Sequence, residues 1–385
     1  MRKKIALLWA EPSLGLYANR SFESLFRAVG GNSGNLAFVY AIQNQLVGDI
    51  TFLPWSSTRE QVAAYDAVVI PCANQLGDHT DLGGLALSMG EFDKPIIAIG
   101  LGAQANSLDE DVQVTPGTLR WVKALASKRA GAVSNIWTRG PFTTQQLDKL
   151  GVEGTIVGGC PTHFMHQSSD LGRRIHKSWT STPLPRAITV AGGHQAWTQV
   201  RTVEHQLIAM MQDPLFPGQY ITQSPGEMLR VSRNDFEAIE PEVMEQIRSH
   251  VAPHYTEDEF RLWCRSYARV YYDIPAWMES LRRYDLTIGP RYHGVALAIQ
   301  AERMGVTIAF DSRTEEMCIQ TGVPCLRAAD LSDKPLTRLS LKRLIRFDPD
   351  AYDRHRSERA QAYVAFLEGN GLQPADYLKR IAAGM

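Results

Sequence analysis

The sequence predicts an α/β protein in which two parallel sheets, each covered by helices, face each other across a cleft. Short runs rich in valine and isoleucine alternate with longer segments of helical period, a pattern typical of strand–helix units around a parallel sheet. The 385 residues exceed the size at which a single core usually stops growing, so we expect two domains. The carboxyl ends of the strands in both halves should therefore meet at one crevice, where ligands of open α/β sheets bind.

The composition excludes several classes of protein. With 44% hydrophobic and 21% charged residues, the chain is neither disordered nor of low complexity. A net charge of −1 argues against binding to nucleic acid through a broad basic surface. The first apolar run, Ile5–Trp9, is too short for a signal peptide, and no run reaches the ~18 residues of a membrane span. Five scattered cysteines without a CxxC pair suit reduced thiols, so we expect a soluble, cytoplasmic protein.

The first half, residues 1–180, should form one doubly wound sheet. Its expected strands are Ile5–Trp9, Ile50–Leu53, Ala67–Ile70, Ile96–Gly100, Ile136–Thr138 and Thr155–Val157. Its expected helices are Leu36–Val47, Arg59–Tyr65, Pro116–Ala130 and Pro141–Leu150. The last of these begins with a proline, which suits the first position of a helix.

A connector rich in proline, serine and threonine, Trp179–Arg186, marks the domain boundary, and the second domain should cover residues 181–349. Its expected strands are Ala187–Ala191, Gln219–Thr222, Leu286–Gly289 and Val306–Phe310. Its expected helices are Thr198–Met211, Pro241–Val251, Glu257–Val270, Pro275–Arg283, Tyr292–Met304 and Arg313–Thr321. Residues 350–385 should form two polar helices that pack back across the connector.

The densest group of chemically active residues follows the expected strand Leu286–Gly289. Arg291 and His293 lie in the turn, and an apolar helix begins at once. The free N–H groups and dipole of a helix start attract an anion, and Arg291 adds a fork-shaped cation. The dipole should keep His293 neutral until a bound phosphate favours its protonation, which would make the ring a general acid. The alternative is that both side chains only satisfy local carbonyl groups.

A second element follows the next expected strand. Ser312 is expected as the N-cap of a helix, with Glu315 completing a capping box. Asp311 and Arg313 stand at the same helix start, so Arg313 and the main-chain donors can share an anion with the Arg291 turn.

Other residues allow less specific interpretations. His194 follows the expected strand Ala187–Ala191 and should point toward the crevice as an anion partner, although an exposed loop histidine is an equal alternative. Cys160, His163 and His166 are zinc-ligand types without a convincing fourth ligand, so no metal site is predicted. Aromatic residues between 260 and 277 have helical spacing and should form a core face rather than a sugar platform.

The segment Arg291–Gly294 (RYHG), the small-residue helix after it, Gly305-Val306 and Asp311–Arg313 (DSR) resemble the polysaccharide pyruvyl transferase family. The resemblance is strongest over about 285–325 and fainter elsewhere. It implies two facing Rossmann-like domains of the glycosyltransferase-B type. It also implies an enzyme that places the pyruvyl group of phosphoenolpyruvate on a sugar as a ketal, with Arg291 and His293 meeting the phosphoenolpyruvate.

The first half shows the same resemblance, with departures. Gly31–Leu36 (GNSGNL) is similar to an early Asn-x-Gly-Asp loop of the family, with Asn35 in place of aspartate, and Asn32, Gly34 and Asn35 are expected to bind substrate. Pro71–Gln75 (PCANQ) replaces a glycine run of the family, so the acceptor pocket should differ. The matching segments at strand ends are Ile99–Gln104, Thr138–Thr144 with Arg139 as a substrate-binding residue, and Gly159–Thr162.

The predicted enzyme is a transferase that forms a pyruvate ketal on a surface polysaccharide or exopolysaccharide precursor and releases phosphate. Arg291, Arg313 and the helix start should hold phosphoenolpyruvate while His293 delivers a proton to its methylene carbon. Asp311 and Asp78 are candidates for the base. The chemistry requires no cofactor or metal, because arginines can neutralise the phosphate. The acceptor is a sugar or lipid-linked oligosaccharide, and peripheral contact with the inner membrane is left open.

Two alternatives stay open. A glycosyltransferase of the same architecture would bind the diphosphate of a nucleotide sugar at the basic turn, with Glu315 and Glu316 available for the ribose. A non-catalytic saccharide-binding protein would fit the departures at Asn35 and Pro71.

Overall fold

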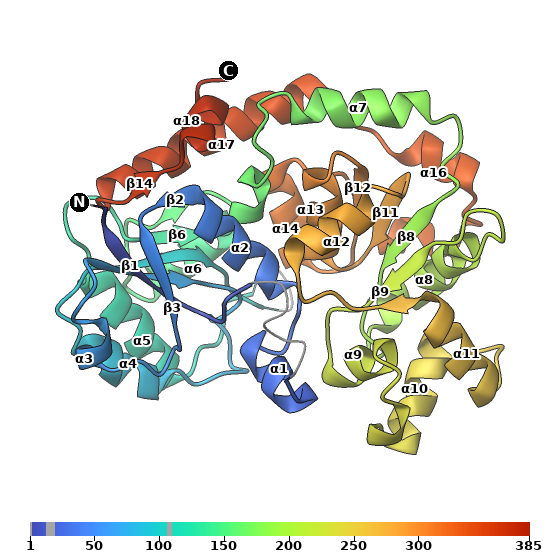
Figure 1. The fold of residues 1–385 in the computed structure, drawn as a ribbon, viewed down its shortest axis with the longest axis horizontal. Helices are drawn as coiled ribbons and strands as arrows, with labels where there is room; N and C mark the ends of the chain where they lie inside the picture. Colours follow the sequence, from blue (N-terminus) through green and yellow to red (C-terminus); the bar gives the residue numbers. More distant parts are fainter. Residues whose placement is uncertain (1, 13–19, 106–109) are drawn as a thin grey trace.

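The structure, a computed structural model, describes residues 2–12, 20–105 and 110–385. Each half of the chain builds one parallel sheet with helices packed on its faces, and the two sheets lie next to each other (Figure 1). This confirms the predicted α/β fold class. The C-terminal helices α17 (Pro349–Gly369) and α18 (Asp376–Ala382) run along one edge of the molecule.

In the described residues, the first sheet has six strands in the order β3-β1-β4-β5-β6-β7, all parallel. Its strands are β1 (Lys4–Leu8), β3 (Asp49–Leu53), β4 (Ala67–Pro71), β5 (Ile96–Leu101), β6 (Ile136–Thr138) and β7 (Ile156–Val157). Both β4 and β5 are buried along their whole length, which explains their continuous apolar sequences. The strand order reverses between β1 and β4, because β3 lies on one side of β1 and the later strands extend from the other.

The second sheet has the order β10-β9-β8-β11-β12-β13 over its described residues, again all parallel. Its strands are β8 (Ile188–Ala191), β9 (Gln219–Ile221), β10 (Ala268–Arg269), β11 (Leu286–Gly289), β12 (Met304–Ala309) and β13 (Cys325–Arg327). Counted along the chain, this is the 3-2-1-4-5-6 order of doubly wound sheets. The order reverses between β8 and β11, so the loops after these two strands border the usual ligand position.

The helices alternate with the strands in both halves. The first half contains α1 (Phe22–Ala28), α2 (Asn35–Gln45), α3 (Arg59–Val62), α4 (Gly83–Gly90), α5 (Pro116–Ser127), α6 (Pro141–Lys149), the 3₁₀ helix η1 (Pro161–Phe164) and α7 (Leu171–Ser181). The second half contains α8 (Thr198–Met211), α9 (Gly226–Ser232), η2 (Phe236–Ala238), α10 (Pro241–Val251), α11 (Glu257–Tyr267), α12 (Ile274–Leu281), α13 (Tyr292–Gln300), α14 (Ser312–Thr321), α15 (Ala328–Leu331) and α16 (Arg338–Leu344). None of the helices in the described ranges is long and apolar enough to cross a bilayer.

The C-terminal segment is anchored to the first half. Strand β14 (Gln373–Pro374) pairs antiparallel with β2 (Leu46–Val47). On α17, Tyr363 and Phe366 pack against Trp137, with ring centroids 4.9 and 5.4 Å away. The fully buried guanidinium of Arg356 donates to backbone carbonyls in residues 163–168. The tail therefore fixes η1 and the chain around it, directly beside Cys160.

Several sequence-based boundaries need correction. The segment expected as a helix over Tyr292–Met304 is helical only to Gln300, because Met304 begins the buried strand β12. The helix expected over Glu257–Val270 ends at Tyr267, where the chain enters β10. Helix α7 extends into the expected connector, and residues 182–187 alone join it to β8. The edge strands β10 and β13 are too short to give a periodic signal.

Candidate functional site

The site begins where β11 gives way to α13. Gly289 ends the strand with φ 153°, and a Cβ there would lie 2.3 Å from the carbonyl oxygen of Ala191 on β8. Only glycine allows β8 and β11 to approach so closely at this point. The chain then turns through Pro290, and Arg291 becomes the N-cap residue of α13. The predicted Arg291–His293 turn therefore lies at the strand reversal of the second sheet.

Arg291 is held from two sides. Its guanidinium carbon lies 4.2 Å from the centroid of the Trp197 ring, and one terminal nitrogen donates to the backbone carbonyl of Ser224 at 2.9 Å. Burial lowers the pKa of Arg291 to about 10, with the nearby Arg313 charge contributing. Its buried Nε–H has no acceptor among the described residues. A fixed cation with an unused donor is suited to an anionic ligand.

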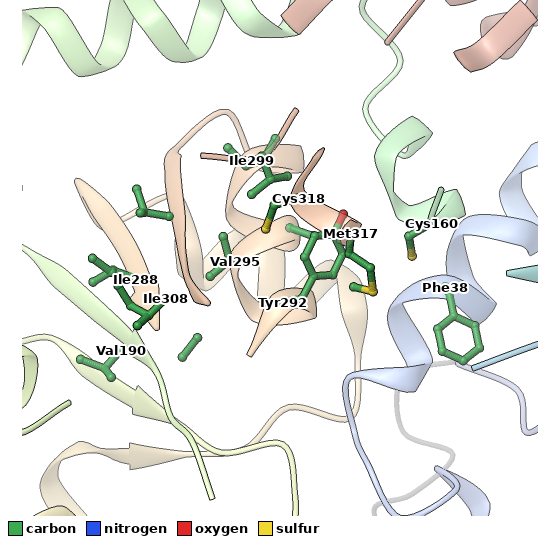
Figure 2. Packing of buried hydrophobic residues seen from close by; sticks show 14 of the residues in the cluster. Phe38, Cys160, Val190, Ile288, Tyr292, Val295, Ile299, Ile308, Met317 and Cys318 are labelled. Atoms are coloured by element: carbon green, nitrogen blue, oxygen red, sulfur yellow. The ribbon is translucent and has the colours of Figure 1, made fainter. Parts of the chain in front are cut away.

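His293 lies in the first turn of α13 and is covered by the opposite half of the molecule. The residue is 8% exposed, its ring centroid is 5.6 Å from that of Phe38, and its Nε2 is 3.7 Å from the sulfur of Cys160. Figure 2 shows Phe38 and Cys160 on segments of the first half that face Tyr292 and Met317 of the second. The turn is therefore enclosed between the two halves.

The imidazole of His293 is surrounded by positive charge. Burial lowers its pKa well below the usual range, and Arg139, Arg313 and Arg291 lower it further. The neutral ring expected from the sequence thus owes its state mainly to burial and to these arginines. An anion bound among them would offset their charge and raise the pKa of His293.

Arg313 joins the site from α14, whose N-cap differs from the prediction. Asp311, and not Ser312, caps this helix: its Oδ1 accepts a hydrogen bond from the N–H of Thr314 at 2.8 Å. A strand-end aspartate with extended backbone is well placed for that role. The other oxygen of Asp311 is 3.6 Å from Arg313, which also donates to Gln104 of the first half at 3.5 Å. Asp311 is therefore already engaged by its own helix and by Arg313.

The two glutamates considered for binding a ribose make other contacts. Glu315 pairs with Arg327. Glu316 reaches across to the first half, where its carboxylate accepts a hydrogen bond from the N–H of Phe142 at 2.6 Å, in the first turn of α6. Burial raises the pKa of Glu316. This contact ties α14 to α6.

Arg139 lies beneath the site in the first half. Its buried guanidinium donates to the carbonyl oxygens of Gly100 and Cys72, at 2.8 and 3.1 Å, and to Oδ1 of Asn74 at 3.2 Å. Its charge lowers the pKa of His293. Arg139 therefore ties the chain after β4 to strand β5 and contributes to the positive potential, while its direct contact with substrate stays a prediction.

The Asn32–Asn35 loop touches His293 through a glycine. A Cβ on Gly34 would lie 2.3 Å from Oε1 of Gln223 and 3.2 Å from Cβ of His293, so a larger residue there would have to displace the Gln223 side chain and crowd His293. The side chain of Asn32 accepts from the N–H of Gly34 at 2.8 Å, and Asn35 donates to the carbonyl of Val29 at 3.0 Å. The loop is thus brought to the site as predicted, and both asparagines stabilise its turn.

His194 lies near Arg291, as expected for a residue after β8. Its ring is 5.8 Å from Trp197, and its Nδ1 accepts a hydrogen bond from the N–H of Ala196 at 3.0 Å. Burial lowers its pKa, and the Arg291 charge adds to this effect. His194 is therefore half-buried beside the cation and is not simply an exposed loop residue.

A buried network beneath this loop escaped the sequence analysis. Glu204 on α8 accepts hydrogen bonds from the N–H of Gly193 at 2.8 Å, the hydroxyl of Tyr220 at 2.6 Å and Nε2 of His250 at 3.2 Å. Burial alone would raise the pKa of Glu204, but these hydrogen bonds and His250 more than offset it and leave the pKa lowered. The carboxylate holds the loop that carries Trp197, on which Arg291 stacks. Partners so distant in sequence leave no local signal.

The considered zinc ligands do not converge. Cys160 faces His293, the Nδ1 of buried His163 is 3.4 Å from the hydroxyl of Tyr352, and His166 bonds Glu302 at 2.8 Å. Within the described ranges, no three histidine, cysteine, aspartate or glutamate residues form a group suited to a metal ion. The aromatic segment 260–277 packs in the core through Phe260, Trp263 and Trp277, as predicted.

A large pocket lies at the strand reversal of the first sheet. It has a volume of about 830 Å³ and is bordered by the chain after β1 and after β4. Its walls combine aromatic rings, amide side chains and charged side chains; among them are Trp9, Glu11, Arg20, Arg27, Asn32, Asn35, Phe52, Trp55, Asn74, Gln75, His79 and Gln104. Asp78, the other candidate base, is exposed and precedes His79 of this wall. The pocket reaches the arginines, because Asn74 bonds Arg139 and Gln104 bonds Arg313.

The chain is distantly similar to several solved structures, including the following three. A putative UDP-N-acetylglucosamine 2-epimerase from Listeria monocytogenes is 10% identical with a TM-score of 0.45, over 96% of this chain and 97% of that one. UDP-GlcNAc 2-epimerase from Methanocaldococcus jannaschii is 11% identical with a TM-score of 0.39, over 94% and 99%. T4 phage BGT, in complex with its UDP-glucose substrate, is 9% identical with a TM-score of 0.34, over 95% and 99%.

Comparison with curated proteins finds no match. The model of the family described as polysaccharide pyruvyl transferase matches residues 32–312. The match runs from the Asn32 loop to the start of α14 and so includes the strand reversal of the second sheet and the Arg291–His293 turn. The chain therefore belongs to the polysaccharide pyruvyl transferase family.

Proposed function

We propose that this transferase moves the pyruvyl group of phosphoenolpyruvate onto a saccharide, forms a cyclic pyruvate ketal and releases phosphate. One observation carries the proposal: the buried imidazole of His293 lies in the first turn of α13 against Cys160 and Phe38, and burial and the charges of Arg139, Arg313 and Arg291 lower its pKa. Such a site attracts a small multivalent anion and places a proton carrier beside it.

Donor binding is assigned to the second half. Arg291, stacked on Trp197, and Arg313 on α14 flank the start of α13 and supply charge for the phosphate and carboxylate of the donor. Because these cations neutralise the phosphate, we propose that the reaction needs no resident metal or cofactor.

The proton transfer follows from the electrostatics of His293. The dianionic phosphate offsets the charges of the arginines, so the ring gains a proton as the donor binds. Protonated His293 then gives that proton to the methylene carbon, which becomes a methyl group. The central carbon becomes electrophilic and a sugar hydroxyl adds to it. The carbon–oxygen bond to phosphate breaks, and a second hydroxyl of the same sugar closes the ring. One of the two hydroxyl protons passes to the released phosphate and the other to the base.

The acceptor is assigned to the pocket of the first half. Its inner end is formed by Asn32, whose loop lies against His293, and by Gln104, which bonds Arg313. A saccharide there would present hydroxyl groups toward the donor. The precursor of a surface polysaccharide or exopolysaccharide is the acceptor class that fits the family.

The test is release of phosphate from phosphoenolpyruvate, measured with and without simple galactosides and mannosides. We expect release to depend on the saccharide and to be lost in His293→Ala, and a ketal-bearing product to appear in the mass spectrum. Tight binding of a uridine or guanosine diphosphate without any phosphate release would instead favour a glycosyltransferase. Saccharide binding with neither activity would favour a non-catalytic relative.

A further inference from the structure

We infer that the pocket of the first half contains a second sugar subsite, in which a sugar unit beyond the one that reacts binds against Trp9 and Trp55. This inference rests on the proposed function, since it places a subsite in the acceptor pocket of the same enzyme. It follows from the position, size and wall chemistry of the 830 Å³ pocket.

The position follows from the sheet topology. The strand order of the first sheet reverses between β1 and β4, and the pocket is lined by residues that follow these strands, including Trp9 and Asn74. Ligands of open α/β sheets bind at such reversals. The donor site occupies the equivalent point of the second sheet, so the two sites meet across the interface between the halves.

The aromatic wall is rigid. Trp9 and Trp55 meet edge to face at 5.6 Å, Trp55 stacks on the buried Trp121 at 6.0 Å, and Trp9 meets Phe38 at 5.5 Å. Phe38 in turn lies 5.6 Å from the ring of His293. Rings fixed by their neighbours lose little entropy on binding, and their faces suit the apolar faces of pyranose rings.

Other residues of the pocket supply hydrogen-bonding groups. Asn32, Asn74, Gln75 and Gln104 bring amide groups to the pocket. Asn74 donates to Gln104 at 3.4 Å, and the two are tied to Arg139 and Arg313 respectively. Amides pair with hydroxyl groups as both donors and acceptors. The amides that bond Arg139 and Arg313 therefore mark the donor side of the pocket, and we assign the second sugar to Trp9 and Trp55.

The pocket is larger than a single sugar unit requires. Pockets of about 300–1,000 Å³ typically hold ligands of drug size, and the three-carbon donor is assigned to the second half. A single hexose beside the amides that bond Arg139 and Arg313 would leave the space beside Trp55 unfilled. A di- or trisaccharide would use both.

The experiment compares acceptor length. Binding of galactose- and mannose-based mono-, di- and trisaccharides to the full-length protein without phosphoenolpyruvate is measured by calorimetry, and KM for each is measured with saturating phosphoenolpyruvate. For at least one series we expect the trisaccharide to bind about tenfold more tightly than the monosaccharide, in line with one added aromatic contact.

Two substitutions of Trp55 test whether this residue causes the preference for longer acceptors. Trp55→Ala should reduce the preference for the longer acceptor to about twofold, and Trp55→Phe, which keeps a ring and the fold, should retain part of it. Leu87→Ala, at an exposed position on α4, is the control and should leave the preference unchanged. KM for phosphoenolpyruvate should stay within about twofold of wild type in all three, because the donor site is separate.

Each other outcome is informative. Equal affinity for all lengths, no saccharide binding at all, or a length preference that survives Trp55→Ala would overturn the inference, even if ketal transfer is active. Length-dependent binding that needs Trp55, without any turnover of phosphoenolpyruvate, would support the pocket while contradicting the proposed reaction.

Discussion

Both sheets of this molecule reverse their strand order beside their first strand, but the strand orders differ and the residues at the two reversals differ in chemistry. In the second sheet the loops after β8 and β11 carry His194, Trp197 and Arg291, and the potential is positive. In the first sheet the corresponding chain after β1 and β4 carries Trp9 and Asn74, and the pocket wall combines aromatic rings and amides with the charged residues Glu11, Arg20 and Arg27. Topology thus fixes where ligands bind, and the loop residues decide what binds.

The largest effect should come from removing His293, the proposed proton carrier of the second half. His293→Ala should lower kcat by about 10²–10⁴-fold, because positioned acid catalysis is worth that much. Binding of phosphoenolpyruvate should change little, since the arginines remain. Rates of phosphate release and calorimetric titration check both points. His254→Ala, at an exposed position, is the control. A His293 variant with near-normal kcat would remove the residue from the mechanism.

The second largest effect should be the loss of kcat/KM when either arginine of the proposed donor site is replaced, and its size should differ between the two. Arg291→Gln should lower kcat/KM for phosphoenolpyruvate by about 10²-fold, because the bound anion loses a buried cationic partner. Arg313→Gln should cost about tenfold, since Arg313 is more exposed and shares its charge with Asp311. Neither change should alter saccharide binding in the first half. An equal loss of saccharide affinity would show that the two reversals do not act as separate sites.

A smaller effect should come from the network that positions Arg291. In Glu204→Gln, KM for phosphoenolpyruvate should rise about 3–10-fold with kcat within about twofold, as for residues that orient a ligand-binding group. Tyr220→Phe removes one hydrogen bond of the same network and should give a weaker version. If both variants lowered only the melting temperature and left KM unchanged, the network would be a folding feature alone.

The smallest effect concerns pH. In the free enzyme the pKa of His293 is well below its usual range, and donor binding should raise it. Since kcat/KM reports the free enzyme and kcat the bound one, the alkaline fall of kcat should begin at a higher pH than that of kcat/KM. Steady-state profiles from pH 5 to 9 check this, and His293→Ala should lose both limbs. If the alkaline limbs of the kcat and kcat/KM profiles coincided, donor binding would not raise the pKa of His293.

Much of the donor site was predictable from local sequence. Arg291, His293 and Arg313 stand directly after buried apolar strands, and such strands give a strong signal. The Gly34 loop was found through resemblance to the family, and the structure explains it by contact with His293.

The rest depends on contacts between distant segments. Glu204, Tyr220 and His250 meet only because α8, β9 and α10 pack together, and Trp9 joins Trp55 across β1 and β3. Nothing in a local window marks such residues. The expected cap Ser312 failed for a different reason: Asp311 stands one position earlier and competes for the same backbone donors.

The proposal that phosphoenolpyruvate binds beside His293 is tested most directly by a crystal structure of the complex. We predict that the phosphate and carboxylate contact Arg291, Arg313 and the first N–H groups of α13, with the methylene carbon facing a ring nitrogen of His293. Phosphoenolpyruvate bound away from His293, or absent from the enclosed turn at saturating concentration, would contradict it.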